Sequence, residues 1–147
     1  MTNAATATIL LEFRTEIVAP PGRVFAALTE AEHLACWFCD EAESHPAPGG
    51  RLLLRWTRPG SSPVPFEGRW VVFEGPSSCA YDGGHAGYPD AYAGRVGFEI
   101  APGGPGSVLT TRHRLPNRLD YVPIAEAYRA AWPRGLVRLA EYLAAAG

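Results

Sequence analysis

Thr15–Phe38, TEIVAPPGRVFAALTEAEHLACWF, is the part of this chain that best identifies its fold. Residues 9–18, which overlap the start of this stretch, alternate between apolar and charged side chains. This alternation predicts a half-buried strand with Phe13 on its inner face. Pro20 stops this strand, and Pro21 suits the first turn of a helix. A strand that ends in a proline break is therefore expected at the start of the domain.

Two short amphipathic helices are expected after the two prolines. Thr29 and Glu32 have the spacing of a capping box, in which each side chain accepts a hydrogen bond from the other residue's backbone N–H. The second helix would then bury Leu34, Trp37 and Phe38.

The middle of the chain predicts antiparallel strands separated by turns rich in glycine and proline. Residues 82–94 have no periodicity and many turn formers, so a long loop is expected there. This loop carries His85, Tyr88, Asp90 and Tyr92, and two interpretations stay open: a lid over a ligand site, or a plain surface loop. The expected strands are 51–58, 66–74, 77–81, 95–101 and 107–115.

From Tyr121 onward the apolar period changes from two to about 3.6 residues, which predicts a long C-terminal helix. Pro133 lies inside this pattern and is expected to kink the helix or to begin a second segment. The order of elements indicates an α+β fold, with one domain over residues 1–147: a curved antiparallel sheet wrapped around the C-terminal helix. The apolar stripe of that helix is Ile124, Tyr128, Ala131, Trp132, Leu136, Leu139 and Leu143.

Composition excludes several functions. The formal net charge is −2, which argues against a general nucleic-acid binder. All thirteen basic residues are arginine, so Schiff-base catalysis by a lysine and a lysine-containing phosphate loop are excluded. The three cysteines and the absence of a leader-like start predict a reduced, cytoplasmic protein, and no apolar stretch is long enough to span a membrane.

The chain resembles the SRPBCC superfamily, also called START-like or birch-allergen-like helix-grip proteins. Within it, the chain is similar to the AHSA-like branch, named after the activator of the heat-shock-protein ATPase. The resemblance covers most of the chain and is weak over 59–94. The residues that carry it are Val18–Pro21, Val24, Phe25, Ala27–Thr29, His33, Leu34, Trp37, Phe38, Thr110–His113, Trp132, Leu136, Leu139 and Leu143.

The resemblance implies a cavity between the sheet and the C-terminal helix that holds an apolar or aromatic small molecule. Some members of the superfamily cyclise or dehydrate polyketides, and a few from antibiotic clusters sequester or react with a toxic product. We therefore expect a protein that binds or sequesters a hydrophobic, aromatic ligand. A polyketide cyclase or dehydratase is the alternative, and a chaperone-interacting module is the third hypothesis.

Aromatic side chains on the inward faces of the strands are the main candidates for the cavity wall, since they offer large contact area to a flat ligand. For any single one of them ordinary core is the more common role, whereas the set as a whole favours a cavity lined with aromatic side chains. The expected lining is Phe13, Trp37, Trp56, Trp70, Tyr81, Tyr92, Phe98, Thr111, Tyr128, Trp132 and Leu136.

His113 is the candidate catalytic residue, because an imidazole in an apolar pocket can act as a general acid or base. A structural histidine satisfied by one hydrogen bond is the alternative interpretation. In the enzyme hypothesis, the hydroxyl of Tyr81 or Tyr92 would polarise a substrate carbonyl.

A metal site is a further possibility that the sequence raises. His33, Cys36 and Cys39 could begin a zinc site, but no second pair of cysteines completes it, and helix packing explains these residues better. We expect no metal and no cofactor, and either a monomer or a homodimer. The acidic residues from Asp40 to Glu43 are expected to form the solvated end of the second helix.

Overall fold

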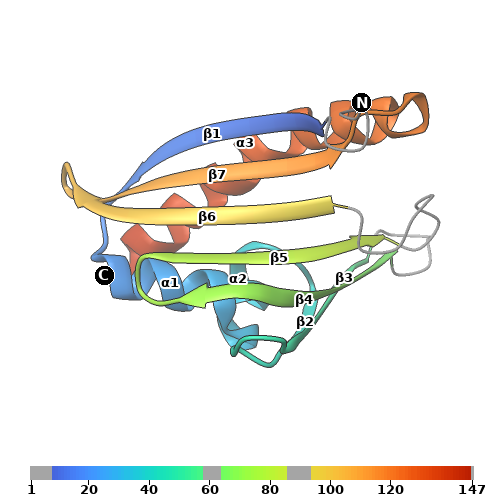
Figure 1. Ribbon diagram of the computed structural model, residues 1–147. Helices are drawn as coiled ribbons and strands as arrows, with labels where there is room; N and C mark the ends of the chain where they lie inside the picture. The colour runs from blue at the N-terminus through green and yellow to red at the C-terminus, as the bar shows by residue number, and fades with distance from the viewer. Residues whose placement is uncertain (1–7, 58–63, 86–93, 147) are drawn as a thin grey trace.

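The computed structural model describes residues 8–57, 64–85 and 94–146. Seven strands form a single antiparallel sheet in the order β1-β7-β6-β5-β4-β3-β2 (Figure 1). The strands are β1 (Thr8–Ile17), β2 (Glu41–Ser44), β3 (Arg51–Trp56), β4 (Val64–Glu74), β5 (Ser78–His85), β6 (Gly94–Gly103) and β7 (Gly106–Pro116). The helices are α1 (Pro21–Thr29), α2 (Ala31–Trp37), the 3-10 turn η2 (Leu119–Tyr121) and α3 (Val122–Ala146). The predicted helix-grip fold is confirmed.

The first and last strands of the chain lie side by side, because β1 pairs with β7 along its whole length. In β1 the side chains alternate as expected: Leu11 and Ile17 are buried, whereas Glu12 and Glu16 are exposed. On the outer face Arg112 bonds both Glu12 and Glu99, and so links three neighbouring strands. One face of the sheet is thus left to be covered by helices.

The junction between α1 and α2 differs from the predicted capping box. Glu30, in extended conformation, ends α1 and begins α2, with no side-chain cap. The hydroxyl of Thr29 donates instead to the carbonyl of Phe25 one turn earlier, at 2.8 Å. Thr29 is still helical and buried, so its side chain turns back into α1 and cannot cap α2.

Two further expectations need correction. The acidic residues after α2 belong partly to a strand, β2, in which Glu41 and Glu43 both lie within 4.0 Å of Arg55. Strand β5 continues to His85, so the first four residues of the expected loop are extended; the segment 86–93 lies outside the described residues. Short, charged strands such as β2 carry too little apolar pattern to be recognised in sequence.

Two features that allow a sheet to bend lie where β4 and β5 pair. A bulge interrupts their pairing between Trp70 and Val72, and bulges bend the strand that carries them. Gly68 and Gly83 face each other in register, and a Cβ on Gly68 would lie 2.5 Å from the carbonyl oxygen of Asp82. Glycine permits this close approach, so the sheet can curl around its apolar face.

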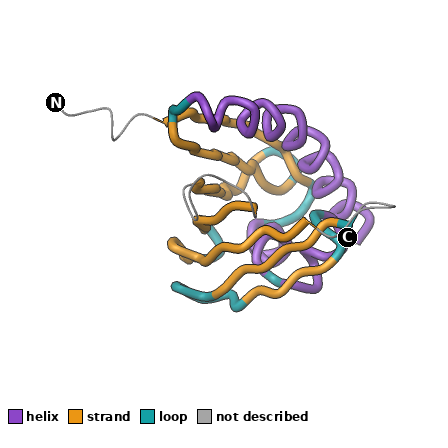
Figure 2. The backbone as a smooth tube through the Cα atoms, turned by 90° about the vertical axis from the view of Figure 1, so that its right-hand side faces the viewer, coloured by secondary structure: helices purple, strands orange, loops and turns teal. Residues whose placement is uncertain are grey.

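Helix α3 covers that face. It runs without interruption through Pro133, so no second segment begins there. In Figure 2 it follows a curved path along the sheet. Pro133 is exposed, which leaves the carbonyl that it cannot bond on the solvent side. The buried residues of the helix that join the main core are Trp132, Leu136, Leu139 and Leu143.

Candidate ligand cavity

A cavity of about 390 Å³ lies between the sheet and α3. Helix α3 contributes side chains three or four residues apart, which is the spacing of one helix face. The sheet contributes residues from β3, β4, β5 and β7, and Phe38, just after α2, also lines the cavity. The described lining residues are Phe38, Leu54, Trp56, Phe66, Tyr81, His85, His113, Tyr128, Ala131, Trp132, Gly135 and Arg138.

The wall of the cavity is mostly aromatic, and its rings are held by one another. Phe38 stacks on Trp37 and on Trp132, with ring centroids 4.7 and 5.8 Å apart, and meets Trp56 edge-on. The indole N–H of Trp56 donates to the backbone carbonyl of Phe38 at 2.7 Å. This part of the cavity wall is therefore formed by fixed rings, which lose little freedom when a ligand binds.

His113 is held in the cavity wall in a defined form. The indole N–H of Trp132 donates to Nδ1 of His113 at 3.0 Å, and the ring of Tyr128 lies 4.3 Å away. Burial, with a smaller effect of the nearby His85, lowers the pKa of His113 to about 3. The imidazole is thus neutral, and because Nδ1 accepts a hydrogen bond, the proton is on Nε2.

Nε2 of His113 is the polar atom that this arrangement leaves available. Among the described residues, no group accepts a hydrogen bond from it. His113 is 2% exposed and lines the cavity, so a ligand that enters can supply the missing acceptor.

The structure places the eleven residues expected to line the cavity in three groups. Trp56, Tyr81, Tyr128 and Trp132 line it, together with His113. Tyr92 lies outside the described residues. The remaining side chains pack within or against the core and do not line it: Phe13, Trp37, Trp70, Phe98, Thr111 and Leu136.

Hydrogen bonds explain why two of the tryptophans belong to the core. The indole of Trp37 donates to the carbonyl of Ala27 at 2.8 Å, and that of Trp70 donates to the hydroxyl of Ser44 at 3.1 Å. Each indole is turned toward a backbone or side-chain partner at the α1–α2 end of the sheet. Alternation alone cannot show this, since it gives the face of a strand and not the position along it.

Several lining residues were not expected from the sequence. Phe38, Leu54 and Phe66 could have been assigned equally well to the core, and His85 was placed in a loop. Gly135 is the residue whose position in the sequence could have indicated the cavity. A glycine inside a helix lowers helix stability by about 1 kcal/mol relative to alanine, so its presence there needs a reason. Gly135 is buried, and a Cβ added there would meet nothing within 4 Å.

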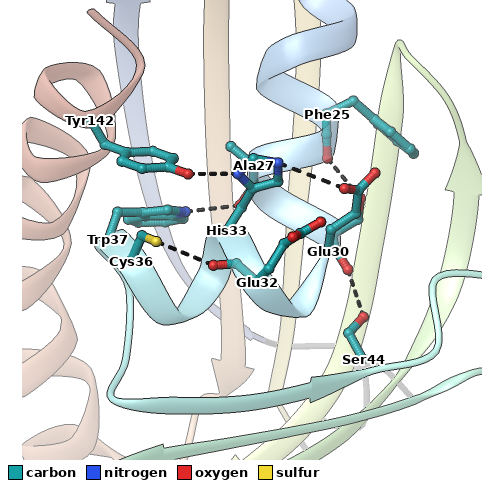
Figure 3. A network of polar contacts seen from close by, with 10 residues as sticks. Phe25, Ala27, Glu30, Glu32, His33, Cys36, Trp37, Ser44 and Tyr142 are labelled. Atoms are coloured by element: carbon teal, nitrogen blue, oxygen red, sulfur yellow. Dashed lines mark hydrogen bonds and ion pairs between the residues drawn. The ribbon is translucent and has the colours of Figure 1, made fainter. Parts of the chain in front are cut away.

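The cysteines do not form a metal site with His33. Cys39 and Cys79 are buried, and burial raises the pKa of their thiols to about 11 and about 12, so both stay protonated. The thiol of Cys36 donates to the carbonyl of Glu32 in its own helix (Figure 3).

His33 instead connects α2 to α3. Its Nδ1 lies 2.6 Å from the hydroxyl of Tyr142, and its Nε2 lies 3.7 Å from a carboxylate oxygen of Glu30 (Figure 3). Glu30, Glu32 and His33 have ligand atoms within 4.8 Å of one another, but both carboxylates are exposed, and water can solvate them without an ion. We assign this cluster a structural role.

The family model of "Activator of Hsp90 ATPase homolog 1-like protein" matches residues 18–144, so the chain belongs to this family. No match was found among curated proteins. Among the described residues, no helix combines the length and hydropathy needed to cross a membrane.

Solved structures share the fold. A protein from Rhodobacter sphaeroides is 26% identical, with a TM-score of 0.79; 92% of this chain and 93% of that chain are covered. The Aha1 dimer from Colwellia psychrerythraea is 15% identical, with a TM-score of 0.73 and coverage of 92% and 96%. DynU16, from the dynemicin biosynthetic locus, is 20% identical, with a TM-score of 0.74 and coverage of 91% of this chain and 46% of that chain.

Proposed function

We propose that this protein binds an apolar, aromatic small molecule in the cavity between the sheet and α3. The observation that carries the proposal is the cavity itself, about 390 Å³ with a mostly aromatic wall. Pockets of roughly 300–1,000 Å³ with a few polar groups are the usual sites for small ligands. That DynU16, a protein of a biosynthetic locus, has the same fold supports a small-molecule ligand.

The state of His113 favours binding over acid–base turnover. A general base works best when its pKa lies near the working pH, whereas the pKa of His113 is about 3 and its Nδ1 is already occupied by Trp132. The neutral Nε2–H is a good hydrogen-bond donor. We infer that it orients an acceptor oxygen of the ligand.

Filling the cavity from Gly135 tests the proposal. Native mass spectrometry and tryptophan fluorescence, with a panel of polycyclic aromatics, should show capture by the wild type, since Trp56 and Trp132 line the cavity. Gly135→Phe places a ring in the open space beside α3 and should reduce affinity at least tenfold.

Val137→Phe is the matched control, because Val137 lies on the same helix and is 56% exposed. It adds the same ring on the solvent side and should leave capture unchanged. A wild-type protein that captures no member of the panel would contradict the proposal. So would a Gly135→Phe variant that binds as tightly as the wild type.

A further inference from the structure

The charge of the cavity wall is unbalanced. Of the described residues that line it, Arg138 carries a formal positive charge and none is an aspartate or glutamate. The two histidines on the wall do not alter this sign, because His113 is neutral and a protonated His85 would only add positive charge. An anionic ligand would therefore meet attraction and no repulsion from these groups.

The position of Arg138 is fixed by the protein itself. Its Nε donates to the backbone carbonyl of Trp37 at 3.2 Å, at the point where α2 ends. No carboxylate of residues 8–57, 64–85 or 94–146 forms an ion pair with it. The two terminal guanidinium nitrogens thus remain available at a defined place, and their spacing matches the two oxygens of a carboxylate.

The surroundings of Arg138 place this charge at the edge of the apolar space. Arg138 is exposed, whereas Gly135, one turn earlier on the same helix face, is buried and open toward the cavity. A ligand can therefore lay a flat ring against the helix at Gly135 while a carboxylate stays at the solvent boundary. Such an arrangement avoids the cost of burying the charge.

We propose that the ligand is an aromatic carboxylate, with its ring against Gly135 and its carboxylate on the guanidinium of Arg138. This inference rests on the proposed ligand-binding function and narrows it to one chemical class. The aromatic wall selects the ring, and Arg138 selects the anion.

Two probes of the same shape test the charge. Isothermal titration calorimetry with 2-naphthoate and 2-naphthamide compares an anion with its neutral counterpart. Wild-type protein should bind the naphthoate about tenfold more tightly, as expected for a charge-assisted hydrogen bond that is partly exposed to solvent. The preference should decrease as salt is added.

Variants of two arginines on α3 test whether Arg138 causes the preference for naphthoate. Arg138→Gln should abolish the preference for naphthoate and leave the affinity for naphthamide unchanged, and Arg138→Lys should restore most of it by restoring the charge. Arg134→Gln is the matched control, because Arg134 is exposed on the same helix and does not line the cavity. It should bind both probes as the wild type does.

The outcomes distinguish the preference for an anion from the proposed ligand-binding function. Wild-type protein that binds naphthamide as tightly as naphthoate overturns the anion inference and leaves the ligand-binding function standing. A preference for naphthoate that survives in Arg138→Gln overturns the role of Arg138. Wild-type protein that binds neither probe counts against both proposals.

Discussion

At the scale of single residues, two buried polar side chains on the inward face of β7 differ in their hydrogen bonding. His113 accepts a hydrogen bond from Trp132 on Nδ1 and lines the cavity. Thr111, two residues earlier on the same face, is fully buried, and its hydroxyl has no partner among the described residues. A buried hydroxyl without a partner costs stability.

Replacing Thr111 should therefore stabilise the protein. Thr111→Val keeps the branched shape and removes the unsatisfied hydroxyl, so the free energy of unfolding should rise by about 1 kcal/mol. Urea denaturation followed by far-UV circular dichroism measures the change. Loss of stability in this variant would show that the hydroxyl has a partner.

Ser107→Ala on the same strand is the matched comparison, because Ser107 is also buried but donates to the carbonyl of Ala19 at 2.6 Å. It should lower the free energy of unfolding by about 1–2 kcal/mol, since the carbonyl loses its partner.

At the scale of elements, α3 combines two features that weaken a helix, Pro133 and Gly135. Pro133 faces solvent, where water can satisfy the backbone carbonyl it leaves unbonded. Gly135 faces the cavity, where any side chain would take up ligand space. The helix thus gives up intrinsic stability at the position where it lines the cavity.

Alanine substitutions separate helix stability from cavity shape. Gly135→Ala should raise the free energy of unfolding by about 0.5–1 kcal/mol, because its Cβ meets nothing within 4 Å, and should also change ligand affinity. Gly22→Ala, in the exposed first turn of α1, should give a smaller gain and leave affinity unchanged.

Gly106→Ala provides the opposite control. Its Cβ would lie 2.6 Å from the backbone nitrogen and oxygen of Ala19, so this variant should be clearly destabilised. Thermal unfolding measures all three variants. A Gly135→Ala protein less stable than the wild type would contradict an open position beside α3.

At the scale of the whole molecule, the neutral state of His113 links global stability to pH. Its pKa is about 3 in the folded protein and near 6.5 when unfolded, so between these values the unfolded state binds more protons. Stability from this group is therefore complete above pH 6.5 and is lost as the pH falls toward 3. The slope approaches 1.4 kcal/mol per pH unit.

The pH dependence should be weaker without this imidazole. Between pH 7 and pH 5 the wild type should lose roughly 2 kcal/mol through His113, and His113→Gln should not show this part of the loss. Urea midpoints of both proteins over this range give the difference, in which the contributions of other groups cancel. Parallel curves would show that His113 is not neutral and buried in the folded state.

The order and type of most elements, and with them the family, could be predicted from the amino-acid sequence alone. These elements are marked by local patterns: the strand alternation before Pro20, the helical stripe after Tyr121 and the aromatic pair at Trp37. A local pattern can be recognised from a short segment without the rest of the chain. Where a local signal was weak, as in β2, or had a competing partner, as at Thr29, the prediction was wrong.

Which side chains line the cavity could be seen only in the folded structure. Trp56 and Trp70 both read as inward-facing aromatics, yet one lines the cavity and the other is fully buried at 0% exposure. Arg138 became a candidate ligand group because the end of α2 supplies a carbonyl that fixes its guanidinium. The curvature of the sheet and its distance from α3 set these relations. They join residues distant in the chain, so no periodicity in the sequence records them.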